Sequence, residues 1–127
     1  MILFIDAKQN DDEKLTGKPF QSRGGRIFQD KLVKAGISPK DYEVIYLAGK
    51  DVCVLPLPKL VIVLGKLPLS SFIKNPKLSD YLYKFIHQAD YTIGILPSID
   101  AISKQSKKAD VVLLDFLCKV KEYVQKI

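Results

Sequence analysis

Cysteine, histidine and long apolar runs are scarce in this chain of 127 residues, and each shortage excludes a class of protein. The two cysteines, Cys53 and Cys118, are too few for a disulfide framework and lack the CxxC spacing of metal sites. The longest branched apolar run, residues 60–64, is far shorter than the roughly 18 residues that span a membrane. No basic leader precedes the first apolar residues. We therefore expect a cytoplasmic protein with reduced thiols, no metal and no membrane partner.

The composition is that of a folded chain. Hydrophobic residues make up 47% of it, which is too high for a disordered protein, and seven glycines and seven prolines exclude low-complexity polymers. A chain of this length buries roughly two-thirds of its unfolded surface and folds without disulfides or metals. Because we find no repeat and no linker, we expect one domain over residues 1–127.

Positive charge is concentrated in one part of the chain. Residues 14–40 hold a single acid, Asp30, and seven basic residues, so this stretch carries +6, which equals the net charge of the whole chain: Lys14, Lys18, Arg23, Arg26, Lys31, Lys34 and Lys40. Two of these arginines flank Gly24 and Gly25, and a second cluster (Lys104, Lys107, Lys108) follows Ser98. Glycine allows close backbone approach, and the N–H groups of a helix start attract anions. The pattern indicates a polyanionic partner.

Apolar periodicity predicts alternating strands and helices. We expect strands at 1–6, 42–47, 60–65 and 91–96, and helices at about 25–35, 68–74, 79–88 and 109–126. The continuous apolar run at 60–64 suits a parallel strand covered on both faces. These elements predict a three-layer α/β/α fold around a four-stranded, mostly parallel sheet, with ligands beyond the carboxyl ends of the strands.

Residue types that carry catalysis are few. The only histidine, His87, lies in a predicted helix, where a packing or surface role is more common than a catalytic one. Asp6 ends the first strand, where an acid can be catalytic or can cap a helix. The chain has neither a Gly-Lys-Ser/Thr phosphate loop nor GxGxxG, so we expect no cofactor.

Several segments, in order, resemble the uracil-DNA glycosylase superfamily, most closely its iron–sulfur branch. They are Thr-Gly-Lys-Pro-Phe-Gln-Ser-Arg-Gly-Gly-Arg-Ile-Phe at 16–28, Leu-Pro-Lys-Leu-Val-Ile-Val-Leu-Gly-Lys at 57–66, Leu-Pro-Ser at 96–98, and the last helix. The resemblance implies the glycosylase-like fold just described. It also implies an ancestral enzyme that flips a uracil out of DNA.

The departures from that family fall on its chemistry. The family's water-activating acid corresponds to Ala7, its histidine beside the leaving base to Leu96, and its uracil-reading asparagine to Gly49. Only Phe20, which stacks on the base in the family, is retained, and the four cluster cysteines are missing. Losing one preorganised donor typically costs roughly 10²–10³ in rate. The resemblance therefore implies a catalytically inactive member.

We expect a non-specific DNA-binding protein of replication or repair, acting as an accessory to a polymerase or another replication protein. Phosphate contacts are expected from Lys18, Arg23, Gly24, Gly25 and Arg26, and from Ser98, Lys104 and Lys107. Two alternatives remain open at this point. The first is an active uracil-DNA glycosylase that uses Asp6 to activate water, and the second is a structural subunit whose basic loop binds an acidic protein.

Overall fold

Four parallel strands form most of a single sheet in the computed structural model, which describes residues 2–7, 14–15, 17–47 and 58–126. The sheet has five strands among these residues, in the order β2-β1-β3-β5-β4, and only β4 is antiparallel to its neighbour. The strands are β1 (Ile2–Asp6), β2 (Tyr42–Tyr46), β3 (Leu60–Leu64), β4 (Phe85–His87) and β5 (Thr92–Leu96). The predicted α/β class and the four parallel strands are confirmed, whereas the predicted strand count of four is wrong.

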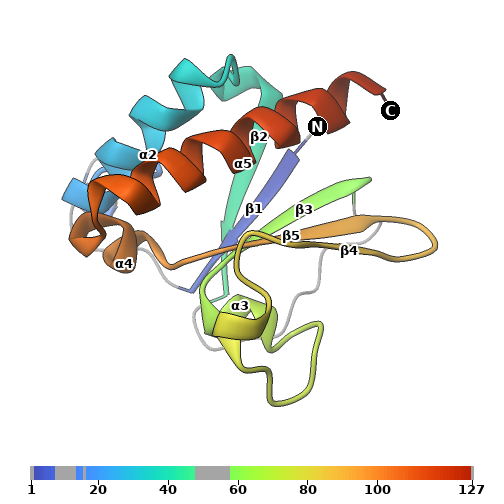
Figure 1. The fold of residues 1–127 in the computed structure, drawn as a ribbon. Coiled ribbons are helices and arrows are strands. Elements are labelled where there is room, and N and C mark those ends of the chain that lie inside the picture. Colours follow the sequence, from blue (N-terminus) through green and yellow to red (C-terminus); the bar gives the residue numbers. More distant parts are fainter. Residues whose placement is uncertain (1, 8–13, 16, 48–57, 127) are drawn as a thin grey trace.

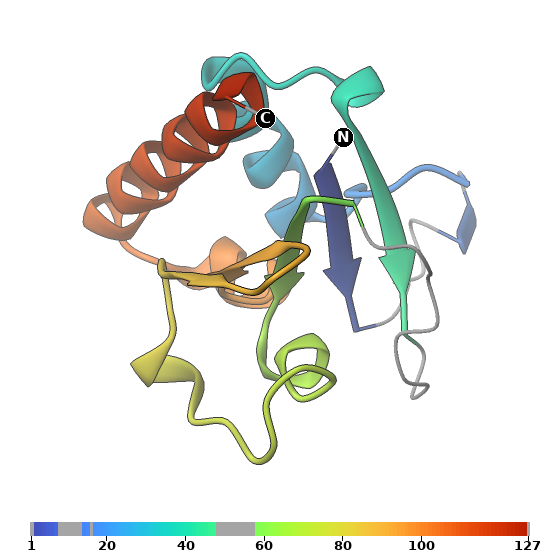
Figure 2. The same ribbon diagram turned by 90° about the vertical axis from the view of Figure 1, so that its right-hand side faces the viewer.

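Both faces of the sheet are covered, but unequally (Figures 1 and 2). One face packs against three helices: α2 (Arg23–Lys34), α4 (Ile99–Lys104) and α5 (Lys107–Lys126). In the described part of the chain, the other face carries the short helix α3 (Lys66–Leu69), a 3₁₀ turn (Leu78–Asp80) and irregular segments. Strands β1, β3 and β5 are buried along their whole length, as their continuous apolar sequences predict. The helices predicted at 25–35 and 109–126 are confirmed within two residues.

The helix predicted at 79–88 is wrong. After the 3₁₀ turn the backbone of Tyr83 takes a positive φ of 59°, which ends helical geometry, and residues 85–87 form β4 along β5. Phe85 then stacks on Phe116 of α5 (4.7 Å between ring centroids), while Ile86 packs on the opposite face. Leu82, Phe85 and Ile86 fit helical spacing, but the adjacent apolar pair Phe85 and Ile86 also suits a strand that packs on both faces. His87 therefore lies on an edge strand and not on a helix.

Two further helices differ from expectation. The helix predicted at 68–74 is α3, which begins earlier, at Lys66, and ends at Leu69. Pro68 lies in its first turn, where the missing backbone N–H of proline removes no helical hydrogen bond. Helix α4 was not predicted, although Ser98 caps it: its hydroxyl oxygen accepts a hydrogen bond from the N–H of Ala101 (3.2 Å). That helix is important here because it packs on the start of α2.

Two glycines allow the start of α2 to lie against its neighbours. A Cβ at Gly24 would overlap the carbonyl oxygen of Ile99, the first residue of α4. A Cβ at Gly25 would lie 2.5 Å from backbone atoms of Phe20. The Gly-Gly pair is thus required by backbone packing on two sides.

We predict that Gly24→Ala destabilises the protein although alanine favours helices. The gain in helix propensity is at most about 1 kcal/mol, whereas overpacking a close contact typically costs about 1–3 kcal/mol. Urea denaturation should show a lower midpoint for Gly24→Ala than for the wild type. The control is Val33→Ala on the same helix, whose side chain is 70% exposed and whose truncation should change little. An unchanged midpoint for Gly24→Ala would show that the α2–α4 contact is looser than described.

Candidate nucleic-acid interface

The start of α2 is fixed by its own cap. The Ser22 hydroxyl oxygen accepts a hydrogen bond from the N–H of Gly25 (3.1 Å), and the Ser22 carbonyl accepts one from Arg26 (2.8 Å). The predicted phosphate contact through the Gly25 amide therefore competes with this cap, and Gly24 lies buried against Ile99. Arg23 and Arg26 are exposed. The side chains of the two arginines, rather than the glycine amides, are available to an anion.

Helix α4 joins this segment to the second basic cluster. It begins at the contact with Gly24, and a helix of its length spans only about 9 Å. Lys104 is the last residue of α4. After two intervening residues, Lys107 and Lys108 begin α5. Figures 1 and 2 show α4 lying between the starts of α2 and α5. We call the exposed side chains gathered here the basic end: Arg23, Arg26, Lys104, Lys107 and Lys108.

Two acids partly offset the charge of the basic end. Asp100 forms an exposed ion pair with Lys104 (3.2 Å), and Asp110 accepts a hydrogen bond from Gln105 (2.9 Å). Exposed pairs of this kind contribute only about 0–1 kcal/mol, so a phosphate can displace one. Five basic and two acidic groups leave a surplus of three positive charges. Ser98, also predicted to bind phosphate, is half-buried and its hydroxyl oxygen caps α4.

Two strand-end residues from the sequence analysis are buried: Asp6, the water-activating acid of the alternative glycosylase, and Leu96, at the place of the family's histidine. Asp6 is 8% exposed, and its carboxylate accepts a hydrogen bond from the N–H of Ala7 (2.7 Å). Leu96 is fully buried among the apolar side chains beneath α2 and α5. Gly49 lies outside the described residues.

Phe20 belongs to the hydrophobic core, and the base-stacking role expected for it is corrected here. Its ring is 0% exposed and meets Phe28 edge-on (5.0 Å between centroids) and Phe4 (6.0 Å). Tyr42 completes this group of four aromatic rings. No surface of the Phe20 ring is open to a base in this structure. Burial follows from Gly25, against which the backbone of Phe20 packs.

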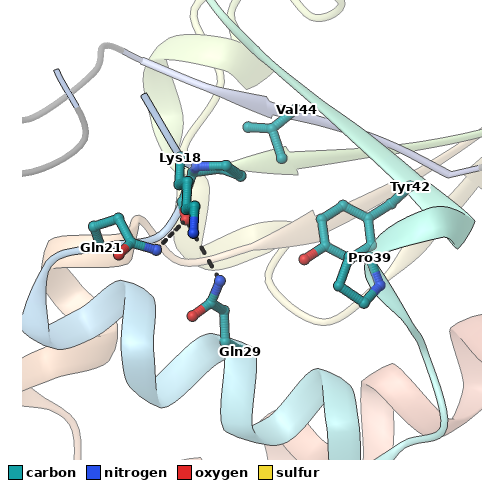
Figure 3. A pocket seen from close by; sticks show the side chains of 7 residues that line it. Lys18, Gln21, Gln29, Pro39, Tyr42 and Val44 are labelled. Carbon is teal, nitrogen blue, oxygen red and sulfur yellow. Dashed lines mark hydrogen bonds between the residues drawn. The ribbon is translucent and has the colours of Figure 1, made fainter. Parts of the chain in front are cut away.

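A groove missed by the sequence analysis lies beside this aromatic group (Figure 3). It has a volume of about 440 Å³, and we call it the β2 groove because Tyr42 and Val44 of β2 form one wall. Its other lining residues come from the segment before α2, from α2 itself and from the turn before β2: Lys18, Pro19, Gln21, Gln29 and Pro39. Burial raises the pKa of the Tyr42 hydroxyl, which therefore stays neutral at physiological pH. No pattern in the sequence brings these seven residues together.

Among the residues that the structure describes, no group of three or more His, Cys, Asp or Glu side chains could hold a metal ion. In the same part of the chain, no helix is both long and apolar enough to cross a membrane. No protein-family model matches this chain, and no curated protein sequence matches it.

We predict that Phe20→Ala lowers stability by about 3–5 kcal/mol, as expected for a buried aromatic side chain. If the Phe20 ring instead lay on the surface, where it could stack on a base, its removal would change the free energy of unfolding little. Thermal and urea unfolding of Phe20→Ala measure the difference. Leu15→Ala is the comparison, since that side chain is 87% exposed and its removal should leave the unfolding midpoint nearly unchanged. Equal stability of the two variants would contradict the core position of Phe20.

Proposed function

We propose that this protein binds DNA non-specifically through the basic end and is a catalytically inactive accessory in DNA replication or repair. The observation that carries the proposal is the contact of Gly24 with Ile99, which brings the start of α2, with Arg23 and Arg26, against the start of α4, the helix that ends at Lys104. Sequence-independent DNA binding depends on such clusters of Lys and Arg, because binding releases the counterions condensed on the phosphates.

The distribution of charge supports a polyanion rather than a small acidic ligand. The basic end consists of exposed side chains at the starts of α2 and α5 and the end of α4, and does not surround a buried site. Both long helices also direct the positive ends of their dipoles toward this region (Figure 1). An extended row of phosphates can contact several such groups at once.

We propose that the fold derives from the uracil-DNA glycosylase superfamily, which the sequence resembles. Four parallel strands with helices on both sides agree with that origin, and β4 is then an added edge strand. Catalysis is not part of the proposal. Asp6 is buried and its carboxylate accepts a hydrogen bond from the backbone N–H of Ala7, and Leu96 lies in the core. A polymerase or another replication protein is the partner that such an accessory requires.

We predict that the affinity for a short DNA duplex falls steeply between about 50 and 200 mM salt, with a slope of roughly 0.9 per phosphate contact in a log–log plot. The double variant Arg23→Ala plus Arg26→Ala should weaken binding and lower the slope by about two. Fluorescence anisotropy of a labelled duplex measures both. The matched control, Lys119→Ala plus Lys126→Ala, removes the same charge from the part of α5 beyond the basic end and should have a smaller effect.

The same measurements separate the alternatives. Affinity that does not change with salt, or equal retention of both double variants on DNA, would overturn the proposal and favour a subunit that binds an acidic protein. Release of uracil from a uracil-containing oligonucleotide by the wild type, abolished in Asp6→Asn, would establish the glycosylase instead.

A further inference from the structure

The β2 groove is adjacent to the proposed phosphate surface but distinct from the strand ends where Asp6 and Leu96 lie. Tyr42 pairs with Ile2 at the beginning of β1, so the groove lies over the first half of β2, on the α2 side of the sheet. Gln29 follows Arg26 by one helical turn, about 4.5 Å along the axis. Arg26 and the groove-lining Gln29 therefore lie close together along α2.

Polar groups in the groove are held in fixed positions. The side-chain N–H groups of Gln21 and Gln29 both donate to the carbonyl of Pro19, at 3.0 and 3.5 Å (Figure 3). Each amide keeps its oxygen as an acceptor and a second N–H as a donor. The Tyr42 hydroxyl points into the same space, and burial keeps it neutral and able to donate. The groove therefore offers both donors and acceptors, the combination that the edge of a nucleobase pairs with.

The remaining walls suit a flat, partly apolar ring. Pro19, Pro39 and Val44 supply apolar surface, and the volume of about 440 Å³ is in the range of roughly 300–1,000 Å³ typical of small-ligand sites. Among the described residues, no acid lines the groove. The nearby carboxylate of Asp41 accepts hydrogen bonds from the N–H and hydroxyl of Ser38, which lower its pKa. The surrounding stretch 14–40 carries +6, which disfavours a basic peptide as occupant.

We propose that the β2 groove takes one unpaired base of a DNA strand whose phosphates lie on the basic end. The inference rests on the proposed function and refines it, because a paired base cannot present its edge to Gln21, Gln29 and Tyr42. The protein should accordingly prefer single-stranded DNA to a duplex. One base held in this way typically contributes enough for a gain of about fivefold or more in affinity.

The test compares three labelled DNAs of equal length by fluorescence anisotropy: a single strand, the same strand with abasic sites throughout, and a duplex. The wild type should bind the base-bearing strand at least about fivefold more tightly than the abasic strand. The double variant Gln29→Leu plus Tyr42→Phe keeps the Tyr42 ring in the core and should remove that difference, leaving abasic and duplex binding unchanged. The matched control is Gln125→Leu plus Tyr91→Phe, which lies away from the groove.

Nuclear magnetic resonance of the wild type gives a second measurement that does not depend on a variant folding. The side-chain amide signals of Gln21 and Gln29 should shift with the base-bearing strand and not with the abasic strand. Equal affinity for both strands, or loss of abasic binding in the groove variant, overturns the groove inference while DNA binding stands. Failure of all three DNAs to bind at low salt overturns the proposed function and the inference together. Binding of an acidic peptide in the groove, with no effect of any DNA on the Gln signals, also overturns it.

Discussion

The close approach of the start of α2 to two other backbone segments is the constraint on which the rest of the molecule depends. Gly24 leaves no room for a side chain beside Ile99, and Gly25 leaves little beside Phe20. The first contact places the arginines of α2 next to α4 and the lysines that follow it. The second draws the segment before α2 inward, so that Phe20 enters the core and Gln21 comes to line the β2 groove. The same two glycines thus position both the basic end and the groove.

Burial of Phe20 among other aromatic rings stabilises the segment before α2. The backbone of Phe20 has a positive φ of 59°, a strained conformation that a buried, edge-to-face aromatic group can maintain because each ring pair adds about 0.5–1.5 kcal/mol beyond burial. Leu96 also lies in the core, and the carboxylate of Asp6 accepts a hydrogen bond from the next backbone N–H.

The sequence predicted the strands well and the short helices poorly, for identifiable reasons. In an α/β fold, a continuous run of branched apolar residues such as 60–64 is stable as a strand that is buried on both faces. The bounds of β3 and of its neighbours β1 and β5 were therefore predicted within a residue or two. The apolar residues of 79–88 fall at helical spacing, and only tertiary pairing with β5 makes residues 85–87 a strand. The clustering of arginines and lysines at the basic end could be anticipated because charge is visible in the sequence. The β2 groove could not, because its residues come from three elements that only tertiary packing brings together.

The positions of the charged side chains, rather than their total charge, determine what the basic end can recognise. Lys34, at the end of α2, forms an ion pair with Asp30 one turn earlier (3.0 Å) and lies away from the helix start. Part of the +6 of residues 14–40 is therefore not on the basic end. Since phosphate contacts carry no sequence information, three surplus charges alone would not let the proposed DNA-binding surface distinguish one form of DNA from another. Discrimination requires groups that meet a base, and in the described residues Gln21, Gln29 and Tyr42 combine fixed hydrogen-bonding geometry with an open groove beside that charge.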